Sequence, residues 1–195
     1  SNPGGESRLR VDVEVVNSDA NVSKVPEPTA PTPRKIPRGH IIARQTERLF
    51  LAGETECPDA IYPSDISNNA NFPKENMIRT PDSKPIVALV PWRNSDLVSL
   101  SERSIHVLSC PANLAVSQWG WTEVSREVGC VAPRTAVTFG NDVFFLSESG
   151  LNSLQIAQQN EQRQLTAVKS APIDDVIRRI NWAQVWKSCA ISFQD

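Results

Sequence analysis

Three short stretches of this sequence are closely alike: "RLFLAGE" at residues 48–54, "DLVSLSE" at 96–102 and "DVFFLSE" at 142–148. Each opens on a polar residue, continues as a mostly apolar run and closes on Glu. With first residues at positions 48, 96 and 142, the stretches start 48 and 46 residues apart. A period of roughly 40–50 residues predicts a repeated structural unit rather than one continuous fold.

The residues around the second stretch predict the content of one unit. Short strands are expected in "KPIVALVPW" (84–92), "LVSLSE" (97–102), "IHVLSC" (105–110) and "GWTEVSREV" (120–128). The continuous apolar run from Ile86 to Val90 is typical of a strand that is covered on both faces. The last strand alternates in polarity instead, which favours a half-exposed position at the outside of the sheet.

About four strands in each 40–50 residues is typical of a blade of a β-propeller. We therefore expect a mainly β, propeller-like domain over residues 41–195, with three or so blades and an incomplete ring. The final "CAISFQD" (189–195) resembles the start of a further strand whose partners are absent. The alternative is a single antiparallel sandwich in which three hairpins resemble one another by chance.

Residues 1–40 form an extended N-terminal segment and a proline-rich arm in this interpretation. "RLRVDVEVV" (8–16) alternates charged and apolar residues, which indicates an exposed or edge strand. Residues 17–39 hold five prolines, which lack the N–H of a sheet ladder and favour polyproline II. Four basic residues could dock the arm on an acidic partner or on DNA phosphate: Arg34, Lys35, Arg38 and Arg44. A solvated linker is the alternative, because four charges are few.

An amphipathic helix is predicted near residues 172–187. Ser170 is a candidate N-cap, and Asp174 and Asp175 stand where the helix dipole favours acidic residues. Apolar residues fall at helical spacing on one stripe: Ile173, Val176, Ile177 and Ile180. The stripe could dock a partner or pack on the edge of a blade.

Composition and motifs argue against several classes of function. The net charge of −2 gives no overall attraction to nucleic acid, and no stretch approaches the roughly 18 apolar residues of a membrane span. The four cysteines form no C-x-x-C pair, so we expect free, mostly buried thiols and no metal site. A Ser–His–Asp triad would need His40 or His106, the two histidines of the chain. No catalytic, cofactor-binding or metal-binding residue is therefore predicted.

Five tryptophans remain, two of them in "WGW", which starts a predicted outer strand. If Trp119 and Trp121 are exposed, they would suit a subunit interface or a platform for sugar. The alternative is that they pack between blades.

The run from Arg48 to Asn181 resembles the propeller of tail nozzle, tail tubular and related tail-completion proteins of short-tailed bacteriophages. The more specific parts of this resemblance are "SERSI" (101–105), "GCVAPRT" (129–135) and "FFLSESG" (144–150). These are structural motifs and not catalytic ones, and the N-terminal arm departs from a complete member of the family.

The resemblance implies a non-enzymatic structural protein of the virion tail, made in the host cytoplasm. Copies of such a protein form a ring around the DNA exit channel, beside other tail proteins, with non-specific contact to passing DNA. The alternative function is a propeller module that binds a carbohydrate or a receptor.

Overall fold

The computed structural model describes residues 36–156, 163–165 and 170–193. The chain divides into residues 1–33 and a compact unit that comprises residues 34–195. The strand predicted at 8–16 and most of the proline-rich arm therefore lie outside the described residues. Of that arm, residues 36–39 are described and have no regular secondary structure.

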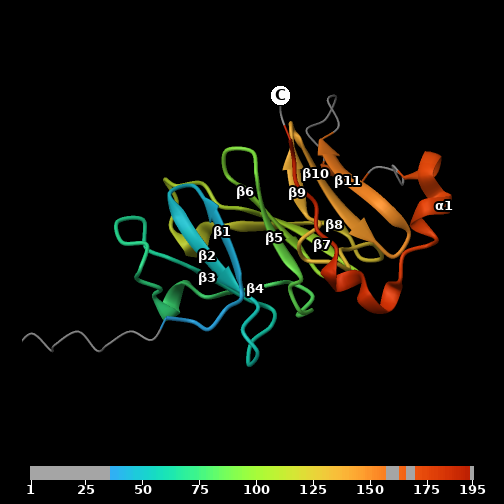
Figure 1. Cartoon of the computed structure of the whole chain (residues 1–195). Coiled ribbons are helices and arrows are strands. Elements are labelled where there is room, and N and C mark those ends of the chain that lie inside the picture. Colours follow the sequence, from blue (N-terminus) through green and yellow to red (C-terminus); the bar gives the residue numbers. More distant parts are fainter. Residues whose placement is uncertain (1–35, 157–162, 166–169, 194–195) are drawn as a thin grey trace, which may run out of the picture. The chain divides into compact units, whose positions relative to one another are not determined.

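The compact unit is mainly β and contains three four-stranded antiparallel sheets (Figure 1). The first sheet has the order β1 (Ile41–Gln45), β2 (Arg48–Ala52), β3 (Ala60–Pro63) and β4 (Ile78–Arg79). The second has the order β5 (Ala88–Trp92), β6 (Asp96–Leu100), β7 (Ile105–Ser109) and β8 (Gly120–Ser125). The third has the order β9 (Val137–Phe139), β10 (Asp142–Ser147), β11 (Gly150–Ile156) and β12 (Arg163–Leu165). Strands that follow one another in the chain are neighbours in every sheet.

The three similar stretches of sequence occupy equivalent places. They form β2, β6 and β10, which is the second strand of each sheet. The expectation of a repeated four-stranded unit is confirmed. The last strand of the second sheet, β8, is more exposed than the strands before it, as its alternating pattern predicted.

Tight turns join the first two strands of each sheet. Thr46 and Glu47 form the first turn with φ angles of 47° and 64°, and Arg93 begins the second with a φ of 53°. The third turn contains Gly140, whose φ of 61° costs glycine little. Positive φ at these positions matches the twist of a hairpin, but residues other than glycine adopt it with strain.

The second sheet is covered on both faces. One apolar cluster joins it to the third sheet, with Val90, Val98 and Val107 packed against Phe145 and Leu154. Another joins its opposite face to the first sheet through side chains that include Phe50, Ile61, Leu89, Leu97 and Leu108. This two-sided burial explains why strands of the second sheet are apolar at consecutive positions.

The first strands of neighbouring sheets are also tied by hydrogen bonds. The amide of Gln45 at the end of β1 donates to the carbonyl oxygens of Trp92 (3.2 Å) and Arg93 (2.8 Å). Between the second and third sheets, the hydroxyl of Thr138 donates to the carbonyl of Pro91 at 2.8 Å. The indole of Trp92 donates to the carbonyl of Asn141 at 2.7 Å. The sheets are therefore joined through β1, β5 and β9 as well as through the two cores.

The outer face of the first sheet is covered by the chain itself. Phe72, from the connection between β3 and β4, packs on Leu51, Ala60 and Tyr62, and all four side chains are buried. The same connection contains the short 3-10 helix η1 (Lys74–Asn76). Another, η2 (Val116–Gln118), precedes β8.

The continuous helix predicted near 172–187 is wrong. Three short elements take its place: η3 (Ala171–Ile173), α1 (Asp174–Ile177) and η4 (Trp182–Lys187). Asn181 adopts an extended conformation between them, and its side-chain carbonyl accepts a hydrogen bond from the N–H of Ala183 at 3.2 Å. This cap gives the backbone an alternative to a continued helix.

The apolar stripe of that segment is not buried along its length on the edge of a sheet, which was one of its two possible roles. Ile173 and Val176 are more than half exposed, and Ile177 and Ile180 are half-buried. No helix in the described part of the chain is long and apolar enough to cross a membrane.

Candidate interaction surface

Four of the six predicted partner-binding residues lie in the described part of the chain. Arg34 and Lys35 lie outside the described residues, whereas Arg38 and Arg44 are exposed. Trp119 and Trp121 are half-buried and pack against the core between the first two sheets. The sequence left open whether these two rings are exposed. In the structure both are partly buried against the core.

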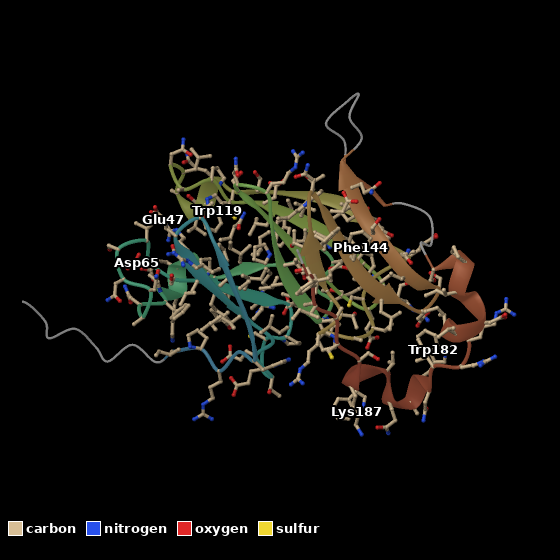
Figure 2. All side chains as sticks on the ribbon, turned by 45° about the horizontal axis from the view of Figure 1, so that its top comes forward. Glu47, Asp65, Trp119, Phe144, Trp182 and Lys187 are labelled. Atoms are coloured by element: carbon tan, nitrogen blue, oxygen red, sulfur yellow. The ribbon has the colours of Figure 1, made fainter. Side chains whose placement is uncertain are left out.

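The ring of Trp119 is held by contacts from the first sheet. It lies 5.9 Å from the ring of Phe50, and the guanidinium of Arg48 stands over it at 5.6 Å. Figure 2 shows Trp119 at the same end of the molecule as Glu47 and Asp65, away from Phe144 of the third sheet. Its neighbour Trp121 meets the imidazole of His106 edge-on.

A groove of about 560 Å³ runs beside the first strands of the sheets. Its lining includes apolar side chains of β1 and β5, the ring of Trp186, and three basic side chains: His40, Arg134 and Lys187. No carboxylate lines it. Figure 2 shows Lys187 and Trp182 on the C-terminal helical segment. The groove therefore combines apolar and basic side chains.

A polar network surrounds His106, which is buried on β7. Its Nδ1 lies 3.9 Å from a carboxylate oxygen of Asp82, and its Nε2 lies 3.8 Å from a carboxylate oxygen of Glu123. The hydroxyl of Ser104 donates to Asp82 at 2.5 Å. Near this network, a hollow of about 350 Å³ is lined by Pro81, Asp82, Lys84, Glu123 and Arg126.

The surroundings of Asp82 change its acidity. Partial burial acts to raise the pKa of this carboxyl, but hydrogen bonds from the Ser104 hydroxyl and the Lys84 amide lower it. The nearby His106 and the ammonium of Lys84 lower it further, and the net pKa lies below the ordinary value of 3.8. Asp82 therefore favours its charged form, which holds the connection between the first two sheets against β7.

The network does not form a catalytic triad. His106 Nε2 and the buried hydroxyl of Ser99, its cross-strand neighbour, both lack a hydrogen-bond partner in the described structure. A serine nucleophile needs a hydrogen bond to its base, and this pair has none. The other histidine, His40, packs against Gly53, where an added Cβ would lie 2.5 Å from the imidazole. Among the described residues, no group of His, Cys, Asp and Glu side chains could hold a metal ion.

The four cysteines are free, as expected. Cys110 and Cys130 are buried, Cys57 is half-buried and Cys189 is exposed, so "mostly buried" holds for two of the four. Burial raises the pKa of the Cys110 thiol to about 11, and burial also raises that of Cys130. These two thiols are protonated and unreactive at neutral pH.

The outer face of the third sheet is apolar and open, unlike the covered faces of the other sheets. Four of its side chains point away from the core shared with the second sheet: Val137, Phe139, Phe144 and Leu151. Phe139 is 48% exposed and meets Phe144 edge-on. We call these four residues the open face.

The segment Ala190–Phe193 lies beside the open face. A groove of about 320 Å³ lies between the two, and no charged residue lines it. Ile191 and Phe193 are 90% and 79% exposed. Just before them, Cys189 pairs with Arg134 in a single parallel bridge, and the N–H of Ala190 donates to the carbonyl of Arg134 at 2.9 Å. A water-exposed apolar groove of this kind is typical of a protein interface.

Sequence reasoning missed both the open face and the His106 network. In β10, the run "VFFL" indicated burial on both faces, but Val143 and Phe145 face the core while Phe144 belongs to the open face. The network could have been found from the pairing of β7 with β8, which places Glu123 opposite His106. Asp82 lies in the connection between β4 and β5, and no periodic pattern in the sequence predicts that a residue of a connection will lie beside His106.

Comparisons with known proteins place this chain in no family. No family model matches it, and no curated protein matches it. Among solved structures, it is similar to a chain of the Chaetomium thermophilum heterotrimeric Nup82 NTD–Nup159 TAIL–Nup145N APD complex, with 15% identity and a TM-score of 0.43. It is also similar to PorZ, a surface component of the type-IX secretion system of Porphyromonas gingivalis, with 18% identity and a TM-score of 0.35.

These two matches cover 66% and 64% of this chain, but only 28% and 16% of the matched chains. The chain thus spans less than a third of the length of either. Likeness at this level carries no argument about function.

Proposed function

We propose that this chain is a structural, non-enzymatic module of a phage tail, and that its three sheets act as propeller-like blades in the wall of a conduit. The observation that carries the proposal is the open face of the third sheet. The second sheet is covered on both faces, and the outer face of the first is covered by Phe72. The third sheet alone among the described sheets presents an uncharged apolar groove to solvent.

An open face of this kind supports assembly because apolar area gains free energy when it leaves water, at about 25 cal/mol per Å². The groove lacks charged residues, so a partner surface can cover it without burying an unpaired ion. The resemblance of residues 48–181 to tail nozzle and tail tubular proteins supplies the setting: a ring built from copies of the chain and from other tail proteins.

Passing DNA would contact the groove along the first strands. Its basic side chains, His40, Arg134 and Lys187, are few enough to allow sliding and are placed beside β1 and β5. Contact of this kind is non-specific and weakens with salt, because it depends on phosphate charge alone.

Native mass spectrometry of the purified full chain, without ligand, tests the proposal. We expect a multimer, which dissociates when the open face is made polar by Phe139→Asp together with Phe144→Asp. The matched control is Ile173→Asp with Val176→Asp, since these two exposed apolar residues lie on the C-terminal helical segment and not on the open face. A monomer that is retained on a glycan array would overturn the proposal in favour of a carbohydrate-binding module.

A further inference from the structure

The segment Ala190–Phe193 has no regular secondary structure and lies beside the third sheet, next to the residues that precede β9. The second and third sheets each begin with a strand that lies beside the first strand of the sheet before it: β5 lies beside β1, and β9 lies beside β5. Side-chain hydrogen bonds from Gln45 and Thr138 join these first strands. A backbone hydrogen bond from the N–H of Ala190 to the carbonyl of Arg134, just before β9, holds the C-terminal segment beside the third sheet. Within the described residues, no strand pairs with 191–193.

This segment and the open face together favour a partner with two properties. Main-chain groups of an extended edge pair readily with another strand, and the open face needs apolar side chains over Phe139 and Phe144. One occupant could meet both needs if it is extended, apolar at every second residue, and charged only on the side that faces water.

The sequence contains such a segment outside the described residues. In "RLRVDVEVV", Leu9, Val11, Val13 and Val15 alternate with Arg8, Arg10, Asp12 and Glu14. As a strand it would present four apolar side chains on one face and two positive and two negative charges on the other. The uncharged groove can cover the apolar face of this strand, while the charged face stays in water.

We infer that residues 8–16 of one copy pair with Ala190–Phe193 of a neighbouring copy and cover its open face. This inference rests on the proposed function, because it names the partner at the same surface. Residues 17–39 connect the donated strand to β1, and in polyproline II a connection of that length spans roughly 70 Å. The contact is head-to-tail, since donor and acceptor are different surfaces. Repetition of such a contact builds a ring when the rotation between neighbouring copies closes, and a filament when it does not.

Two full-length variants test the inference by complementation. The donor-defective chain carries Leu9→Ser, Val11→Ser, Val13→Ser and Val15→Ser. The acceptor-defective chain carries Ile191→Asp and Phe193→Asp, which change residues that are exposed and should leave folding intact. A control chain carries serine at the four charged positions instead, Arg8→Ser, Arg10→Ser, Asp12→Ser and Glu14→Ser, and keeps its net charge.

Light scattering during size exclusion gives the readout. The unaltered chain and the control are expected to be multimers, and each defective chain alone is expected to be a monomer. An equal mixture of the two defective chains should form a heterodimer, because one still has a donor and the other still has an acceptor. A mixture that stays monomeric overturns the exchange between copies.

The outcomes separate the inference from the proposed function. If the donor-defective chain remains a multimer while the open-face variant Phe139→Asp with Phe144→Asp dissociates, assembly stands and donation by residues 8–16 is wrong. If the unaltered chain is itself a monomer at all concentrations, both the donation of residues 8–16 and the proposed assembly are wrong.

Discussion

His106 and its two carboxylates show how single polar residues join parts of this chain. The imidazole is buried on β7, Glu123 lies opposite on β8, and Asp82 comes from the connection that leads out of the first sheet. The imidazole lies between carboxylate oxygens at 3.9 and 3.8 Å, although its buried Nε2 makes no hydrogen bond. The network therefore connects the loop after the first sheet to strands β7 and β8 of the second.

Asp82→Asn should weaken this link in a pH-dependent way. The folded pKa of Asp82 is depressed, so its contribution to stability is full above the unfolded pKa of about 4 and is lost as pH falls through the folded value. We expect a loss of about 1–2 kcal/mol at pH 7, which shrinks toward zero in acid. Urea unfolding at pH 7 and at pH 3 measures it, with the exposed Glu102→Gln as control. An equal loss at both pH values would contradict the role given to the charge.

Turn residues with positive φ give a second test at the same scale. Arg93→Gly should raise the free energy of unfolding by about 0.5 kcal/mol, since relief of left-handed strain exceeds the added chain entropy. Gly140→Ala should lower it by about 1 kcal/mol through strain alone, because an added Cβ there meets no atom within 4 Å. Thermal unfolding of both variants decides, and a shift of the same sign in both would contradict these backbone conformations.

Among the elements, β10 best shows how one strand serves two surfaces. Phe145 is fully buried in the core that the second and third sheets share, whereas its neighbour Phe144 belongs to the open face. There Phe144 meets Phe139 of the adjacent β9, which is 48% exposed. Phe145 and Phe139 lie in one sheet and differ chiefly in the face they occupy.

This difference predicts unequal costs of truncation. Phe145→Ala should lower the free energy of unfolding by about 3–5 kcal/mol, through lost burial and the cavity that remains. Phe139→Ala should cost less than about 1 kcal/mol in a chain whose donor strand carries the four serine substitutions, because its ring then stays in water. Denaturant unfolding of both variants in that background gives the comparison. Similar losses would show that the face assignment in this sheet is wrong.

The strands were predictable from the sequence to a useful degree, and the helical segment was not. Apolar runs bounded by turn residues marked the second strand of every sheet, and burial on both faces explains the unbroken run in β6. In the C-terminal segment, the stripe from Ile173 to Ile180 satisfied helical spacing, but the cap that Asn181 gives to η4 ends the first helical piece. Periodicity indicates which side chains could share a helix face. It does not indicate where a side-chain cap such as that of Asn181 competes with a continued helix.

For the whole molecule, the repeat predicted three similar units but not which faces remain open. That property depends on a connection that holds Phe72 over the first sheet, and on the absence of a comparable cover over the third among the described residues. We propose that another copy of the chain completes this last sheet. The segment Ala190–Phe193 is the place at which a donated strand would pair.

Hydrogen exchange of the backbone amides of Ile191, Ser192 and Phe193 in the full-length, assembled chain tests this claim most directly. We expect these amides to exchange nearly as slowly as those of β5 and β6. Paired amides in a covered sheet exchange only when the sheet itself opens. The protection should disappear in the chain with Leu9→Ser, Val11→Ser, Val13→Ser and Val15→Ser, while β5 and β6 stay protected. Exchange of these three amides in the unaltered chain at the rate of an exposed, unpaired segment would contradict the account.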